Sequence, residues 1–198
     1  HVVRVEFYYG DSLIGTVQEA PYCLEWSEPE PGMHLLQARA IDDGGLEGES
    51  AVIRVEARLP NDAFADRAIL EGNPAATTGS NLGATKETGE PNHAGDPGGA
   101  SVWWSWTAPA SGRAVIRVEV TGGDGMTPLL AVYRGTALGN LTEVGAGSGE
   151  ATARVEFDAA AGETFAIAVD SEFGAAGTFN LSARVGQAPE VELIHPAD

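Results

Sequence analysis

The side chains with the most evident chemical potential lie in one loop, rich in glycine, proline and acidic residues, that leads into an aromatic strand. The candidate ligand-binding residues are Glu87, Glu90, Asn92, His93 and Asp96 in the loop and Trp103 in the strand. Calcium takes six to eight oxygen ligands from carboxylates, amides and carbonyls, so this set could supply a site. One histidine with scattered carboxylates is a weak zinc pattern. The loop therefore either binds an ion or ligand beside Trp103, or folds over the strand and covers it.

Catalysis needs a nucleophile and a base at a suitable spacing, and the sequence offers no such set. The four histidines are dispersed and form no HExxH motif. Ser148 lies in a glycine-rich run, but Glu150 stands where a nucleophile elbow requires glycine. Cys23 is the single cysteine, which excludes an intrachain disulfide and predicts a small buried thiol. We expect a protein that is not an enzyme.

The charge balance limits the partners. The chain has 29 acidic and 11 basic residues, a net charge of −18, and its hydrophobic content of 43% is enough for a packed core. Like charge disfavours nucleic acid and anionic membrane surfaces. No apolar run approaches the roughly 20 residues of a membrane-spanning helix. We therefore expect neither a nucleic-acid partner nor membrane insertion.

The elements that must position these side chains are almost all strands. Residues 1–58 alternate apolar and polar side chains with the period of half-buried strands, broken by turns. Strands are predicted at residues 3–9, 13–17, 22–26, 33–41 and 51–57. Five short, evenly spaced strands favour a β-sandwich.

A boundary follows at residues 58–62, where Pro60 interrupts the strand pattern. Asn61 or Asp62 is predicted to cap a helical turn over residues 63–68. Eight strands then follow, at residues 75–82, 102–106, 113–120, 128–134, 142–146, 151–157, 164–170 and 177–185. Strands with almost no helix predict a jelly-roll-like β-sandwich.

Three of the four tryptophans lie in the strand over residues 102–106. Side chains alternate between the two faces of a strand, so Trp104 and Trp106 share one face and Trp103 lies on the other. One face must be core. The opposite face is either partly exposed or covered by the preceding loop.

The first segment resembles the bacterial immunoglobulin-like repeats of large surface and secreted proteins. The residues that carry the resemblance are Val5-Glu6-Phe7-Tyr8, Leu13-Ile14-Gly15-Thr16, Ala20-Pro21-Tyr22 with Trp26, Pro31-Gly32, residues 34–40 and Asp42. Such repeats usually carry two further strands before the first of these motifs. Residues 188–198 look like the opening strand of another repeat, and we expect residues 190–194 to pair with the incomplete first module of this or a neighbouring molecule.

The second segment resembles the bacterial pre-peptidase C-terminal domain. The matching residues are Asn61-Asp62 with Phe64-Ala65, residues 83–87, 89–95 and 101–109, Leu130-Ala131-Val132-Tyr133-Arg134-Gly135 and residues 165–170. Family members look like non-catalytic modules, and a related group, the collagen-binding domains of clostridial collagenases, binds calcium where the linker enters the sandwich. The resemblance thus makes Asn61 and Asp62 a candidate calcium site. Leu59, Ala100 and Ser101 stand where those relatives carry acidic residues.

Together these features predict an all-β chain in three parts: an Ig-like β-sandwich lacking its first strands over residues 1–58, a jelly-roll-like β-sandwich over residues 59–187, and the start of a further repeat or a linker over residues 188–198. The expected function is that of a non-catalytic spacer or adhesive scaffold in a secreted or cell-surface bacterial protein, with neighbouring β modules as partners. The alternative is an accessory module that binds polysaccharide or an extracellular protein through calcium or exposed aromatic rings. An exposed Trp103 would favour that alternative.

Overall fold

A computed structural model describes residues 1–27, 29–123 and 125–186. The chain divides into two compact units, the first ending at Arg58 and the second beginning at Leu59. Strands dominate both units, and the helical segments of the described residues are three short 3-10 turns. The predicted all-β class is confirmed. None of the helices in the described ranges is long and apolar enough to cross a membrane.

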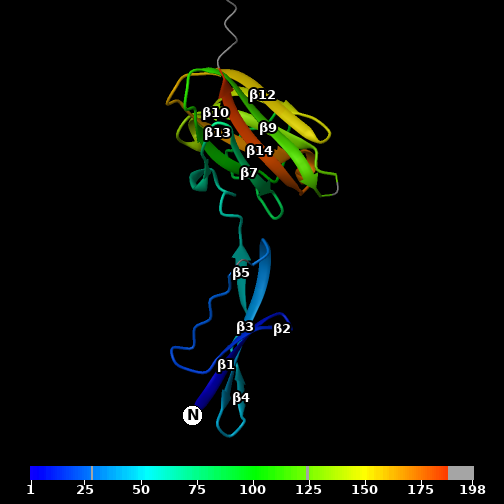
Figure 1. Ribbon diagram of the computed structural model, residues 1–198. Helices are drawn as coiled ribbons and strands as arrows, with labels where there is room; N and C mark the ends of the chain where they lie inside the picture. The colour runs from blue at the N-terminus through cyan, green and yellow to red at the C-terminus, as the bar shows by residue number, and fades with distance from the viewer. Residues whose placement is uncertain (28, 124, 187–198) are drawn as a thin grey trace, which may run out of the picture. The chain divides into compact units, whose positions relative to one another are not determined.

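The strands of the first unit form one antiparallel sheet in the order β2-β1-β3-β4, with β5 also paired to β3 (Figure 1). The long strand β3 pairs with β4 through residues 39–41 and with β5 through residues 32–36. The strand bounds are β1 Val2–Tyr9, β2 Ser12–Val17, β3 Gly32–Asp42, β4 Glu47–Glu49 and β5 Ile53–Ala57.

A coil segment lies against the apolar face of this sheet, where the sequence predicted a strand over residues 22–26. Leu24 packs on Gly15, and the ring of Trp26 contacts those of Tyr9 and His34. The segment alternates in burial like a strand, but it joins no ladder. Cys23 lies between two inward-facing residues and is therefore exposed, so the expectation of a buried thiol was wrong.

The second unit is a sandwich of two sheets (Figure 1). Their strand orders are β11-β10-β13-β8-β6 and β12-β9-β14-β7. All its pairings are antiparallel except that of β6 with β8. The bounds are β6 Ala68–Leu70, β7 Ala75–Ser80, β8 Val102–Thr107, β9 Gly112–Gly122, β10 Pro128–Arg134, β11 Thr142–Ser148, β12 Thr152–Ala159, β13 Thr164–Ser171 and β14 Thr178–Gly186.

The main core lies between these two sheets. Trp104 and Trp106 project into it from β8, where Trp104 meets Phe179 of the facing sheet edge-on at a centroid distance of 5.8 Å. Strand β10 is buried along almost its whole length, as its continuous apolar sequence predicts. Trp103 points the other way and belongs to a smaller cluster on the outer face of the sheet. The predicted division of the three tryptophans between two faces is confirmed.

The start of the second unit differs from the prediction in two respects. A 3-10 turn forms over Phe64–Asp66, but its N-cap is Ala63, without a side-chain hydrogen bond, so neither Asn61 nor Asp62 caps it. Both side chains instead bond to distant segments, Asn61 to the carbonyl of Trp103 and Asp62 to Thr85. The short strand β6 was not predicted. The expected strand over residues 190–194 lies outside the described residues.

Candidate functional site

The loop over residues 81–101 closes over the outer face of β8 and buries Trp103. The Trp103 side chain has no exposed surface. Its ring meets Phe64 edge-on at 5.1 Å, His93 at 5.4 Å and Tyr133 at 5.9 Å between centroids. Its indole Nε1 is buried without a hydrogen-bond acceptor. Trp103, a candidate ligand-binding residue in the sequence, therefore packs beneath the loop and is not available to a ligand.

His93 is held from both of its ring nitrogens. Its Nε2 donates to Glu90 Oε1 at 2.8 Å, and its Nδ1 shares a hydrogen bond of 2.8 Å with the Tyr133 hydroxyl. The side chains of both His93 and Glu90 are fully buried. A two-residue turn aims the histidine inward: His93 and Asp96 pair through their main chains, and Ala94 and Gly95 between them have φ of 52° and 79°, the positive values of a type I′ hairpin turn.

Burial and hydrogen bonding act in opposite directions on Glu90. Burial raises the pKa of the carboxyl, but hydrogen bonds from His93, Ser101 and the Glu87 amide outweigh it, so the net pKa lies below the ordinary value. Burial also raises the pKa of the Tyr133 hydroxyl well above its ordinary value, with smaller contributions from nearby carboxylates. The arrangement favours an ionised Glu90 and a neutral Tyr133, which is a stable hydrogen-bonded set.

The candidate calcium residues are engaged with the same loop. Both carboxylate oxygens of Asp62 accept hydrogen bonds from Thr85, from its amide at 2.6 Å and its hydroxyl at 2.9 Å. Asn61 donates its side-chain amide to the carbonyl of Trp103 at 3.1 Å. Glu87 accepts from the amide of Phe64 at 2.5 Å. These hydrogen bonds connect the first residues of the second unit to the loop and to β8.

Asn92 and Asp96 lie apart from this buried set. Asn92 is exposed, and its carbonyl accepts from the Tyr133 hydroxyl at 3.4 Å. Asp96 is partly buried and caps its own turn by accepting from the amide of Gly98 at 2.8 Å. Across the described ranges, no group of three or more histidine, cysteine, aspartate or glutamate side chains converges in a way that could hold a metal ion.

Two buried polar residues that sequence reasoning missed fix the end of the loop. Asp170 accepts hydrogen bonds from the amides of Gly99, Ala100 and Ser171 at 2.7–3.2 Å. Asn81 donates to the carbonyls of Ala100 and Ala175 and accepts from Gly177 at 2.7 Å. Asp170 ends a predicted strand and Asn81 lies near the end of another, but their partners are up to 96 positions away along the chain. Only the tertiary structure could reveal them.

No family model matches this chain, and no curated protein matches it. Among solved structures, it is similar to the pre-peptidase C-terminal domain of a collagenase from Bacillus anthracis, with 13% identity, 60% of this chain and 96% of that chain covered, and a TM-score of 0.40. It is also similar to PliG from Aeromonas hydrophila, a periplasmic inhibitor of g-type lysozyme, with 13% identity, 61% and 96% covered, and a TM-score of 0.39.

A third similarity is to fibronectin(III)-like modules of CbhA from Clostridium thermocellum, with 20% identity, 100% of this chain and 84% of that chain covered, and a TM-score of 0.27. The collagenase domain is of the kind that the second segment resembles in sequence. The likeness of residues 1–58 to Ig-like repeats stays a prediction.

Proposed function

We propose that this chain is a non-catalytic pair of β modules in a secreted or cell-surface protein, where it spaces or presents neighbouring β modules and contributes to adhesion. The observation that carries the proposal is the state of the loop over residues 81–101. The buried polar side chains at this loop are already hydrogen-bonded within the second unit, and Trp103 of β8, which lies beneath the loop, is fully covered. A loop built this way stabilises a fold and leaves no free nucleophile or base for a substrate.

The His93 pair illustrates why we exclude catalysis from the proposal. A histidine beside a glutamate is a common general-base arrangement. Here both side chains are fully buried, and the second histidine nitrogen is occupied by the Tyr133 hydroxyl at 2.8 Å. A substrate could not reach either ring nitrogen without breaking one of these two bonds and lifting the loop from Trp103.

A turnover screen tests the proposal. The chain is incubated with peptide, ester and glycoside substrates, and we expect no product above the buffer rate. The control is the His93→Gln variant, which keeps hydrogen-bonding capacity but removes the imidazole. The proposal would be overturned in favour of an enzyme if the original chain turned over a substrate and the His93→Gln variant, still melting cooperatively, did not.

Calcium distinguishes the alternative accessory-module function. Calorimetric melts are recorded with calcium and with EDTA, because a ligand at a hundredfold excess over its Kd raises stability by roughly 2.7 kcal/mol. We expect the transition of the second unit to stay in place, since Asp62 already accepts two hydrogen bonds from Thr85. A calcium-dependent rise that the Asp62→Asn variant loses would support a calcium-dependent binding module instead.

A further inference from the structure

The outer face of the sheet β12-β9-β14-β7 gathers positive charge in an otherwise acidic chain. Of the 11 basic residues in the sequence, four lie on this face: Arg113, Arg117, Arg154 and Arg184. All four are exposed and alternate with buried apolar residues along their strands. The face also carries three acidic side chains, Glu119, Glu156 and Asp158. It is therefore close to neutral, slightly positive, within a chain of net charge −18.

The strand register places two of these arginines directly opposite each other. Arg154 of β12 pairs with Arg117 of β9, and like charges directly opposite on one face of an antiparallel pair are destabilising. Ser182 of β14 lies opposite Arg117 on its other side, so no acidic group completes the row. A bound anion between the two guanidinium groups would relieve this repulsion.

The nearby carboxylates compensate these charges unevenly. Arg113 reaches two carboxylates, Glu156 at 3.4 Å and Asp158 at 3.5 Å. Arg117 reaches Glu119 at 3.6 Å, and Arg154 contacts Glu156. Arg184 has no carboxylate within ion-pair distance among the residues that the structure describes.

These ion pairs leave the cations available. Each pair lies at an exposed surface, where it contributes little. A ligand anion can therefore compete for Arg117 and Arg154, and it meets no competitor at Arg184.

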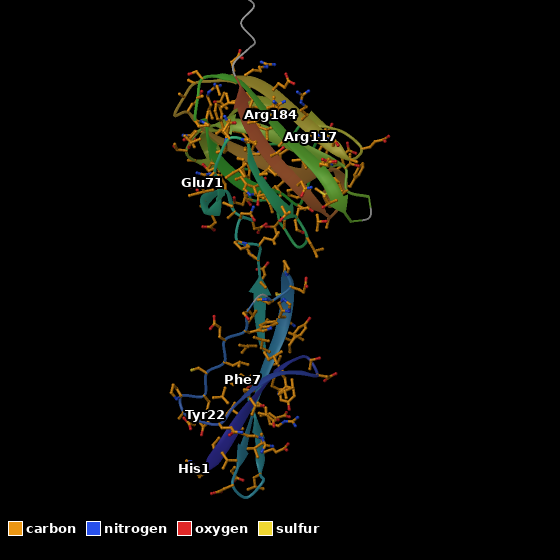
Figure 2. All side chains as sticks on the ribbon, in the orientation of Figure 1. His1, Phe7, Tyr22, Glu71, Arg117 and Arg184 are labelled. Carbon is orange, nitrogen blue, oxygen red and sulfur yellow. The ribbon has the colours of Figure 1, made fainter. Side chains whose placement is uncertain are left out.

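Three of the four arginines line a hollow of about 550 Å³ on the face of the sheet. These arginines are Arg117, Arg154 and Arg184, and the lining also includes Pro74, Val115, Thr152 and Ser182. Arg117 and Arg184, labelled in Figure 2, project from the neighbouring strands β9 and β14. The hollow thus combines guanidinium groups, two hydroxyls and small apolar surfaces.

We propose that this hollow binds an anionic polysaccharide, whose sugar units carry carboxylate or sulfate groups. Guanidinium forks match carboxylate and sulfate oxygens in paired hydrogen bonds. The hydroxyls of Thr152 and Ser182 suit sugar hydroxyls, and Pro74 and Val115 suit the apolar face of a sugar ring. This proposal specifies the adhesive part of the proposed function. It rests on residues away from the loop over residues 81–101.

The position of the hollow favours a sugar over an acidic peptide. Peptides usually bind a sheet at its edge, where free main-chain groups extend the ladder. Here β9 and β14 are paired on both sides, so their main-chain groups are already used in the ladders. A ligand on this face must be recognised by side chains alone, which suits a polysaccharide. The small local excess of positive charge also suits widely spaced anionic groups better than the dense phosphates of a nucleic acid.

The test measures binding of the complete chain by calorimetry to polygalacturonate, heparin, neutral dextran and a polyglutamate peptide. We expect binding to polygalacturonate, to heparin or to both, weakening as salt rises, and none to dextran. Which of the two binds shows whether carboxylate or sulfate is the preferred group.

The variants Arg117→Ser and Arg184→Ser should each weaken binding by roughly tenfold, because each removes a charge-assisted hydrogen bond. The matched control is Arg134→Ser, which removes an arginine about as exposed as Arg117 from β10 in the other sheet. Melting curves should show that neither Arg117→Ser nor Arg184→Ser destabilises the unit.

Several outcomes would overturn the proposal. They are a lack of binding to both anionic polysaccharides, a preference for polyglutamate, or binding that the Arg134 variant loses as strongly as the Arg117 and Arg184 variants. None of these outcomes bears on the absence of turnover, so the two proposals fail separately.

Discussion

Replacing Trp103 with alanine should strongly destabilise the second unit without removing any binding activity. Trp103 is fully buried against Phe64, His93 and Tyr133, beneath a loop that has few apolar anchors of its own. The substitution leaves a cavity that these three rings cannot fill, because Phe64 is held by a 3-10 turn, His93 by the loop and Tyr133 by β10. The loop should loosen together with the core beneath it.

The magnitude follows from the buried area. A tryptophan buries roughly 150–250 Å², which at about 25 cal/mol per Å² gives roughly 4–6 kcal/mol as an upper estimate. Its Nε1 is buried without an acceptor, and an unsatisfied group of this kind costs about 1–3 kcal/mol. The net loss expected for Trp103→Ala is therefore about 3 kcal/mol, within the range usual for such truncations. For a domain of this size, that lowers the melting temperature by roughly 10 °C.

Differential scanning calorimetry provides the assay, because it can separate the transitions of the two units. Trp103→Phe is the matched control, since it keeps an aromatic ring, removes the unpaired N–H and should lose less than half as much stability. Ile69→Ala, at a residue that is 77% exposed, should change little. A decrease of less than about 1 kcal/mol in the free energy of unfolding for Trp103→Ala would refute the reasoning, since removing a ring of this size from a packed core creates a large cavity.

Three further substitutions test separate features of the second unit. Because the pKa of Glu90 is lowered in the folded chain, its ionised form stabilises the fold above the unfolded pKa of about 4.3, and this stability is lost as pH falls through the folded pKa. In urea melts, the free energy of unfolding of Glu90→Gln should therefore fall less between pH 5 and pH 3 than that of the original chain. Gly98→Ala should lower stability by more than about 2 kcal/mol in urea melts, because its φ is +59° and a Cβ would lie 1.7 Å from Asp170 Oδ2. Phe173→Gly should stabilise the unit by about 1 kcal/mol in calorimetry, since Phe173 is 94% exposed and holds a φ of 57° that costs an L-residue roughly 1–2 kcal/mol; a lower melting temperature would contradict this account.

The fold class could be read from the sequence because strand patterning and turn residues carry it locally. Strand β9 shows the clearest case: Ala114, Ile116 and Val118 are buried, and Arg113 and Arg117 between and beside them are exposed. The same rule assigned Trp104 and Trp106 to one face and Trp103 to the other. Alternation depends only on the geometry of an extended chain, so no tertiary information was needed.

Alternation alone does not make a strand, however. Tyr22, Leu24 and Trp26 alternate in burial with their neighbours, as the side chains of a strand do. They reach the sheet as coil, because the segment packs on a face of the sheet and has no neighbouring strand to pair with. The short strands β4 and β6 were missed for the opposite reason. Three residues are too few to show a period. In addition, β6 is defined by its pairing with β8, more than 30 positions further along the chain.

The candidate site could be located from the sequence, but its role could not. A loop dense in acidic residues beside an aromatic strand has the same composition whether its carboxylates face a ligand or the main chain. Asp62 and Glu87 differ from metal ligands only in that their oxygens already accept hydrogen bonds from Thr85 and Phe64. Such partners lie more than 20 positions away along the chain, so composition and spacing cannot show them.

The arginine face differs from the loop, because its side chains do not stand out in the sequence and only the structure brings them together. Arg117 and Arg154 lie 37 positions apart in sequence, and each looks like an ordinary solvent-facing strand residue until the register places them opposite each other. Buried polar groups in the loop have their partners, whereas Arg184 lacks a carboxylate partner among the described residues. Substitutions in the loop should therefore change stability and leave binding intact, and those at Arg117 or Arg184 should do the opposite. Measuring both properties for Glu90→Gln and Arg184→Ser would separate a structural site from a binding site, because a single shared role would move the two properties together.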